Sequence, residues 1–251
     1  MSGHSKWQQI RRKKAVTDSR RGKIFTQIIK EITIASRIGG GDPAGNPRLR
    51  LAIDKAKANN MPAENIKRAI QRGTGELPGV TYDDVTFEAY GPAGVAIIIE
   101  GVTDNRNRTV SEMRYILDRN HGKMAASGAV AYQFHRKGII NIPKTIGEDD
   151  LLAIIVDAGA EDLRTDGELY TVITTPETYE TIKKELEDKK LHIEHAEIQL
   201  LPENTIKLEA KDAITALKLI ESLEEHEDVQ HVYTNIEMDA SVIEQFNAQN
   251  Q

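Results

Sequence analysis

Positively charged side chains crowd the first part of the sequence, and their chemistry is that of phosphate binding. Eight lysines and arginines lie between residues 6 and 23, and a single carboxylate, Asp18, interrupts them. So many like charges repel one another unless a polyanion or neighbouring carboxylates neutralise them. Because each neutralised phosphate releases a counterion, the affinity of this segment for nucleic acid is expected to fall steeply with salt. The eight cations are Lys6, Arg11, Arg12, Lys13, Lys14, Arg20, Arg21 and Lys23.

The single tryptophan of the chain, Trp7, lies within this basic segment. Its ring could stack on an unpaired base or a ribose, or it could pin the segment onto neighbouring helices, and the sequence leaves both interpretations open. Arg48 and Arg50 extend the positive charge along the chain, as do other cations such as Lys30. We predict that Trp7, Arg48, Arg50 and the eight cations of the basic segment contact nucleic acid.

The charge is divided unevenly along the chain. Residues 1–75 hold 17 Lys and Arg against 5 Asp and Glu, and residues 76–251 hold 16 against 34. The formal net charge of the 251 residues is −6. A basic module attached to an acidic body indicates a protein that binds polyanions. The alternative is a solvated helical surface whose cations only offset carboxylates of the same molecule.

No set of residues for catalysis stands out in the sequence. The chain has no cysteine, which excludes disulfides, thiolate zinc sites and cysteine nucleophiles. It also lacks the Walker, GxSxG, HExxH and dinucleotide-binding motifs. His192 and His195 are three residues apart on a predicted strand and would point to opposite faces, so they do not predict a metal site. We therefore expect no enzyme activity, no cofactor, no metal and no small-molecule substrate.

Two loops carry residues that could bind a partner. In residues 103–109, asparagines would cap the helix that follows, whereas Arg106 and Arg108 could instead hold an anion. Residues 121–129 are rich in small side chains and offer backbone amides beside Lys123. This second loop is either a plain helix-to-strand connection or a contact loop on a rigid α/β unit.

The elements that must position the basic residues are predicted to be helices. Between Arg20 and Gly39, apolar residues recur at spacings of three and four, as they do on one face of a helix. Further helices are expected from Pro47 and from Pro62, the latter ending at Gly73. Residues 1–77 therefore form a predicted basic, all-helical domain.

From residue 80 onward the pattern changes to alternating strands and helices. Residues 138–201 follow the order β-α-β-β-α-β, which is the signature of a ferredoxin-like module. The segments before and after it are incomplete layers, and together they would complete a second α/β sandwich with one strand at residues 129–134. We predict an α+β protein with an N-terminal all-helical domain, followed by a discontinuous α/β domain (78–134 plus 204–238), an inserted ferredoxin-like domain (135–203) and a polar tail (239–251).

The composition predicts a reducing, aqueous compartment. The first residues lack the apolar core of a secretory signal. The most apolar short run, residues 94–102, is too short to cross a bilayer. Because cysteine is also absent, we expect a cytoplasmic protein without a membrane partner.

Several segments are distinctive enough to carry a family resemblance. They are GHSKW, RRGKIFTQIIKEI, YGPAGVAIIIE, TDNRNRT and the long block of residues 39–75. On these segments essentially the whole chain resembles the YebC/PmpR family. Its bacterial members are described as probable transcriptional regulators, and its mitochondrial relatives as translational activators of cytochrome c oxidase subunit I.

The resemblance implies a helical N-terminal domain, two α/β domains, a cytoplasmic location and no catalytic residues. It implies a regulator that binds DNA or, as the alternative, a translation factor that contacts ribosomal RNA. A second alternative, drawn from the paired α/β sandwiches, is a ligand-sensing or subunit-docking protein. Residues 20–75 carry no helix-turn-helix signature, which favours binding by charge and shape. The chain departs from the family at Ala125, where a glycine with easy access to positive φ is usual.

Overall fold

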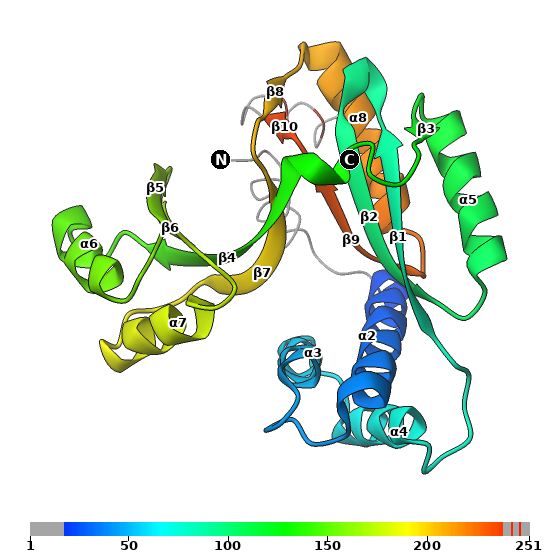
Figure 1. Ribbon diagram of the computed structural model, residues 1–251, viewed down its shortest axis with the longest axis horizontal. Coiled ribbons are helices and arrows are strands. Elements are labelled where there is room, and N and C mark those ends of the chain that lie inside the picture. Colours follow the sequence, from blue (N-terminus) through cyan, green and yellow to red (C-terminus); the bar gives the residue numbers. More distant parts are fainter. Residues whose placement is uncertain (1–17, 238–241, 243–245, 247–251) are drawn as a thin grey trace.

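The computed structural model describes residues 18–237 together with Val242 and Phe246 (Figure 1). It consists of three bodies: a helical unit and two α/β units, each built on an antiparallel sheet. In Figure 1 the helical unit lies below, the first α/β unit above it, and the second α/β unit to the left. The α+β fold class predicted from the sequence is confirmed.

Three helices form the helical unit: α2 (Asp18–Gly39), α3 (Pro47–Ala58) and α4 (Ala63–Thr74). Helices α3 and α4 both pack on α2, whose predicted apolar stripe supplies Ile28 and Ile32 to the shared core. The start of α3 is set locally by Asn46, whose side chain accepts the backbone N–H of Leu49 at 3.1 Å. Pro47 occupies the first helical position, where its missing N–H costs nothing.

Helix α4 does not end at Gly73, so that prediction is wrong. Gly75 adopts a left-handed φ of 82° and forms the C-terminal stop. Gly73 lies inside the helix against α2, where an added Cβ would clash with the carbonyl oxygen of Thr33 and the side chain of Ser36. Glycine at position 73 therefore permits the close approach of two helices.

The first α/β unit contains a four-stranded antiparallel sheet in the order β3-β1-β2-β9. Helices α5 (Arg106–Arg119) and α8 (Ala210–Glu224) cover one of its faces and form the largest core of the molecule with it. The pairing of β2 with β9 completes this sheet with a strand that follows the second α/β unit in sequence. The strands are β1 (Asp83–Tyr90), β2 (Ala96–Thr103), β3 (Lys123–Met124) and β9 (Val229–Thr234).

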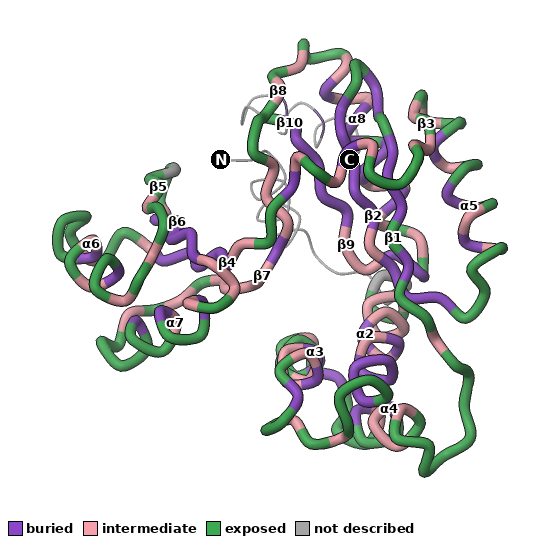
Figure 2. The backbone as a smooth tube through the Cα atoms, in the orientation of Figure 1, coloured by how far each residue is buried: buried purple, intermediate pink, exposed green. Residues whose placement is uncertain are grey.

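Short elements complete the first unit. The 3-10 turn η1 (Pro92–Gly94) connects β1 to β2, and β8 (Ile206–Lys207) pairs in parallel with β10 (Ile236–Glu237). Figure 2 shows how burial concentrates along the strands and on the inner faces of the helices. Among the described helices, none combines the length and apolar content that a membrane crossing needs.

The second α/β unit has the strand order β5-β6-β4-β7, with helices α6 (Glu148–Asp157) and α7 (Tyr179–Asp188) on one face. With the chain order β4-α6-β5-β6-α7-β7, this is a ferredoxin-like arrangement, as its sequence pattern indicates. The exact limits of the domains stay a prediction. The strands are β4 (Phe134–Pro143), β5 (Asp162–Asp166), β6 (Leu169–Thr174) and β7 (His195–Pro202).

Residues 129–133 are not the strand that the sequence predicts. Ala131–Gln133 form the 3-10 turn η2, and β4 begins only at Phe134. The physical reason is Glu88, whose carboxylate accepts the backbone N–H groups of Val130 at 2.7 Å and Ala131 at 2.9 Å. These donors are therefore not available to a neighbouring strand.

Candidate nucleic-acid interface

Some of the predicted contact residues lie in the described part of the chain, and others lie outside it. Arg21 and Lys23 lie on the first turns of α2, where Arg21 is exposed and Lys23 is half-buried. For Arg20, on the same helix, only the backbone is described. The predicted contact residues that lie outside the described part of the chain are Lys6, Trp7, Arg11, Arg12, Lys13 and Lys14.

Arg48 and Arg50 project from α3 and already have partners within the protein. The guanidinium of Arg48 lies 2.7 Å from a carboxylate oxygen of Glu31 on α2 and 2.7 Å from one of Asp84 on β1. The hydrogen bonds to Asp84 and Glu31 raise the pKa of Arg48 above its ordinary value. Arg50 donates to the carbonyl oxygen of Pro43 at 3.3 Å. A phosphate would have to compete with two carboxylates for Arg48.

Other cations of the helical unit face solvent. Lys67, Arg68 and Arg72 lie on the outer face of α4, and Ile66 and Ala69 take the inner face. Arg68 is 3.0 Å from Glu64, but both side chains of this pair are exposed, so it contributes little stability. Within the described residues, neither Lys67 nor Arg72 has an ion-pair partner. The outer face of α4 is therefore open to an anionic partner.

One cation of α2 is buried. The ammonium of Lys30 lies 2.5 Å from Asp228 Oδ1, and the residue is only 6% exposed. It does not extend the positive surface, contrary to the expectation from sequence. The reason is that α2 has a second buried face, on which Gln27 donates to the carbonyl oxygen of Val229 at 2.7 Å and Ile34 is 1% exposed.

Asp228, fully buried before β9, collects three more hydrogen bonds. Its Oδ2 accepts from Arg108 Nη2 at 2.8 Å, from Thr109 Oγ1 at 2.7 Å and from Thr103 Oγ1 at 3.2 Å. Burial alone would raise the pKa of Asp228, but the hydrogen bonds from Lys30, Arg108 and Thr109 outweigh it and lower the pKa to about 2. The ionised carboxylate thus ties α2 to the start of α5. We call this cluster the Asp228 joint.

Both interpretations of the loop at residues 103–109 hold in part. Asn105 caps α5, because its side-chain oxygen accepts the backbone N–H of Arg108 at 3.1 Å. The guanidinium of Arg108 does hold anions, but these are Asp228 and Asp104 of the same chain. Arg106 is exposed.

Glu112, His226 and Asp228 form the one group in the described part of the chain that could share a metal ion. His226 Nε2 lies 2.8 Å from Glu112, and His226 Nδ1 accepts the backbone N–H of Asp228 at 3.1 Å. An ion there would lie beside the charges of Lys30 and Arg108, which repel it. These three side chains therefore fit a contact between the helical unit and the first α/β unit better than a metal site.

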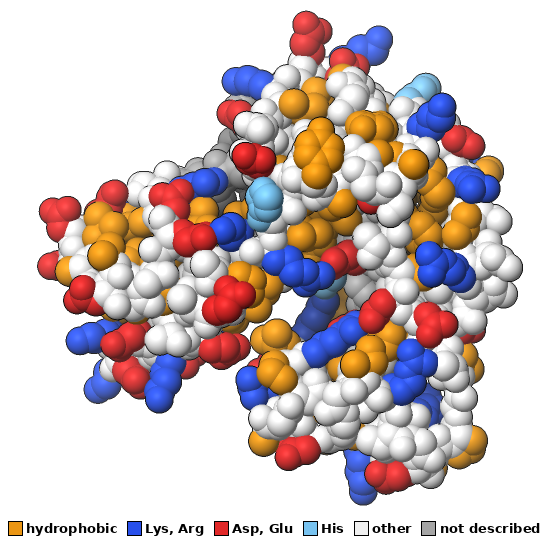
Figure 3. Space-filling model, viewed as in Figure 1, with side chains coloured by type: hydrophobic (Ala, Val, Ile, Leu, Met, Phe, Trp, Pro, Cys, Tyr) orange, Lys and Arg blue, Asp and Glu red, His pale blue; other side chains and the backbone are white. Residues whose placement is uncertain are grey.

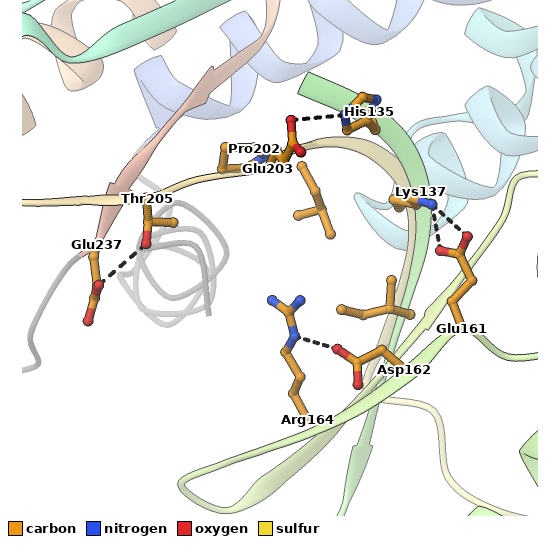
Figure 4. A pocket seen from close by; sticks show the side chains of 11 residues that line it. His135, Lys137, Glu161, Asp162, Arg164, Pro202, Glu203, Thr205 and Glu237 are labelled. Carbon is orange, nitrogen blue, oxygen red and sulfur yellow. Dashed lines mark hydrogen bonds and ion pairs between the residues drawn. The ribbon is translucent and has the colours of Figure 1, made fainter. Parts of the chain in front are cut away.

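A groove of about 420 Å³ lies between the second α/β unit and the β8–β10 pair (Figure 4). The polar side chains that line it have partners within the lining, as the dashed lines of Figure 4 show. A charged ligand would compete with these neighbouring side chains for the same partners. The ion pairs are Lys137 with Glu161 at 2.6 Å and Arg164 with Asp162 at 2.8 Å; His135 Nε2 lies 3.8 Å from Glu203, and Thr205 donates its hydroxyl to Glu237 at 3.4 Å.

Sequence reasoning missed the Asp228 joint. The available signal was on α2, where Gln27, Lys30 and Ile34 are spaced by three and four residues and form a second stripe beside the apolar one. Nothing in the sequence indicated the partner, because Lys30 and Asp228 are 198 residues apart in the chain.

Comparison with known proteins decides the family. The family model described as TACO1/YebC protein N-terminal domain matches residues 5–76, and the one described as TACO1/YebC second and third domain matches residues 82–236. The chain belongs to the TACO1/YebC family. The resemblance to YebC/PmpR proteins drawn from the motifs is thereby confirmed.

Curated relatives match the chain over nearly its whole length. A "Probable transcriptional regulatory protein" of Pelodictyon phaeoclathratiforme is 56% identical over 249 residues, which are 98% of this chain and 100% of the relative. A protein of the same description from Chlorobium phaeobacteroides is 54% identical, with the same coverage. The crystal structure of a conserved hypothetical protein from Aquifex aeolicus has a TM-score of 0.78 and 44% identity, and the match covers 88% of this chain and 92% of that one.

The family's usual glycine at position 125 is not needed for backbone conformation in this TACO1/YebC protein. The residues with positive φ in this loop are His121 at 59° and Gly128 at 84°, and Ala125 is not among them. Ala125 donates its N–H to the carbonyl oxygen of Glu88 at 2.8 Å. The replacement of glycine by alanine therefore introduces no backbone strain.

Proposed function

We propose that this protein is a non-enzymatic regulator that binds DNA through the basic segment and the helical unit. The observation that carries the proposal is the division of charge, with 17 cations against 5 carboxylates in residues 1–75 and an acidic remainder. The exposed outer face of α4 supports it, because its cations continue the positive charge of the basic segment. The relatives described as probable transcriptional regulatory proteins support the regulatory role.

Charge and shape dominate this mode of binding. The cations of the basic segment bind phosphates, and Trp7 stacks on a sugar or on an unpaired base. The acidic α/β units repel the backbone and so orient the nucleic acid toward the helical side. Arg50 adds a contact from α3. Arg48 contributes less, because Glu31 and Asp84 already neutralise it.

A gel-shift titration on duplex DNA at several salt concentrations tests the proposal. Replacing Arg11, Arg12, Lys13 and Lys14 by alanine is expected to weaken binding at least tenfold and to reduce the salt dependence, because four phosphate contacts are lost. The matched control removes four cations from α7 and the residues that follow it, in the acidic body, and should leave affinity nearly unchanged. Unchanged affinity of the first variant would contradict the proposal. The control positions are Lys183, Lys184, Lys189 and Lys190.

The second candidate is a translation factor that contacts ribosomal RNA through the same residues. The absence of a helix-turn-helix signature in residues 20–75 favours it, since a cationic surface without a base-reading helix suits shape recognition of RNA as well as DNA. Gradient sedimentation of lysate separates the two. Migration with ribosomes that survives DNase but not RNase would favour RNA, whereas migration in light fractions with retention on duplex DNA would favour DNA.

A further inference from the structure

Three tyrosines of the first α/β unit are exposed in the described part of the chain. Tyr90, Tyr115 and Tyr132 are 40%, 63% and 71% exposed. Their buried counterparts, Tyr170, Tyr179 and Tyr233, lie within the cores and the sheets. Exposed tyrosine rings offer an apolar stacking face and a polar hydroxyl to a partner.

Tyr90 lies on the face of the sheet that α5 and α8 leave uncovered, and Tyr132 lies in the turn that follows the loop packed on this face. Tyr90 ends β1 directly opposite Lys123 of β3, so these two side chains lie on the same face. The hydroxyl of Tyr90 donates to the carbonyl oxygen of Ala129 at 3.1 Å, which brings its ring against the loop that leads to Tyr132 in η2. We call Tyr90, Lys123 and Tyr132 the tyrosine platform.

Glu88 fixes the loop beside the platform. It lies two residues before Tyr90 on the same face of β1, and its carboxylate accepts backbone N–H groups of Gly128 at 2.5 Å, Val130 at 2.7 Å and Ala131 at 2.9 Å. Burial would raise the pKa of Glu88, but these three hydrogen bonds outweigh it and lower the pKa. The loop is held in one shape, and the negative charge of Glu88 is turned away from the surface.

The charge around the platform favours an anionic partner. Lys123 is exposed and belongs to the platform, and the carboxylate of Glu88 on the same face of the sheet is occupied by backbone N–H groups of the loop. Within the described chain, Lys123 has no ion-pair partner. Figure 3 shows hydrophobic side chains gathered over this face of the first α/β unit, with lysines and arginines along its α5 edge.

We propose that the tyrosine platform binds unpaired bases of a single-stranded nucleic acid, with Lys123 on the phosphate beside them. The inference rests on the proposed function, since it assumes a nucleic-acid target, and adds a second site with a different ligand preference. Two rings offer stacking surfaces to bases of any sequence, and the small exposed residues 126–128 let the strand approach closely. A duplex keeps its bases stacked inside and cannot use the rings.

Fluorescence anisotropy with a labelled oligouridine, and with a duplex of the same length, tests the platform. Tyr132→Ala is expected to weaken oligouridine binding at least about fivefold, the lower end of what one stacked base contributes, and to leave duplex affinity unchanged. Tyr132→Phe retains the ring and should bind like the wild type. Lys123→Ala should lower the salt slope for the single strand by about 0.7.

Tyr115→Ala is the matched control. Tyr115 is nearly as exposed as Tyr132 and lies on α5, outside the platform, so its loss should not change binding. Equal losses for Tyr115→Ala and Tyr132→Ala, or equal losses on duplex and single strand, would overturn the platform.

Further outcomes separate this inference from the proposed function. If replacing Arg11 to Lys14 by alanine abolishes binding and Tyr132→Ala binds oligouridine like the wild type, the platform is wrong and the proposed function stands. If the wild type binds neither oligonucleotide, the proposed function fails, and the platform fails with it. Sedimentation of the protein alone provides a last comparison. If Tyr132→Ala differs from the wild type in sedimented mass but binds oligouridine equally well, the surface serves protein association and the inference is overturned.

Discussion

At the scale of single residues, the most consequential side chain is Asp228. Its carboxylate is fully buried, and it is shared by Lys30 of the helical unit and Arg108 of the first α/β unit. Removing one member of a buried ion pair leaves the other charged, desolvated and unpaired, which is strongly destabilising. The joint therefore makes the helical unit sensitive to one residue that lies outside it.

Asp228→Asn is expected to lower stability by about 3–5 kcal/mol at neutral pH. The pKa of Asp228 is about 2 in the folded protein against an ordinary 3.8, so the carboxylate stabilises the fold above the ordinary value and loses this contribution as the pH falls toward 2. The difference in melting temperature between wild type and variant should therefore be constant near neutrality and shrink below about pH 4. Calorimetry over this pH range measures it.

Asp104→Asn provides the comparison for this prediction. Asp104 also bonds Arg108, at 2.9 Å, but its side chain is 35% exposed. We expect a loss of less than about 1 kcal/mol. A loss as large as that of Asp228→Asn would show that burial of the joint is not what makes it strong.

At the scale of elements, the helices of the helical unit could be predicted closely from sequence. Apolar spacing, Asn46 as cap and Pro47 in the first turn are local signals, and the structure uses them as expected. The prediction of a strand at residues 129–134 is wrong because a distant residue, and not a local signal, decides the structure there. Its alternation of residues suits a strand, but Glu88, about 40 residues earlier, accepts the backbone N–H groups of Val130 and Ala131.

Gly73→Ala tests the close approach of α2 and α4. Alanine has the higher helix propensity by about 1 kcal/mol, yet its Cβ would press on the backbone of Thr33, so we expect a net loss of about 1–3 kcal/mol. Gly22→Ala on α2 is the control, because nothing lies near its added Cβ, and there the propensity gain should appear as a higher melting temperature. Stabilisation by both substitutions would contradict the packing argument.

At the scale of the whole molecule, the sequence could predict a helical N-terminal region followed by α/β units, but not how these bodies meet. The helical unit is attached to the first α/β unit by the Asp228 joint, by Arg48 with Asp84, and by Gln27 at β9. These contacts join residues that are far apart in the chain, so no local sequence pattern predicts them. The sequence gives the positions of the cations along the chain. Only the structure shows that Lys30 is buried in an ion pair with Asp228.

Lys30→Met is expected to loosen the helical unit without unfolding it. The side chain keeps its volume but loses the contact with Asp228, which retains Arg108. Small-angle scattering should show a larger radius of gyration, and proteases should cut faster in the exposed connection of residues 75–81. Arg37→Met, which removes an exposed pair with Asp83, should change neither. Identical scattering for Lys30→Met and wild type would argue that the joint does not hold the bodies together.

The second α/β unit leaves and re-enters the rest of the chain through one pair of neighbouring strands. Phe134 at the start of β4 pairs with Pro202 at the end of β7, and Glu203 donates its N–H to the carbonyl oxygen of Gln133 at 2.8 Å. The two ends thus lie side by side, as the two sides of a hairpin do. In evolutionary terms, a single insertion of coding sequence at one turn of an ancestral two-body protein suffices to produce this architecture, with no rearrangement of the host sheet.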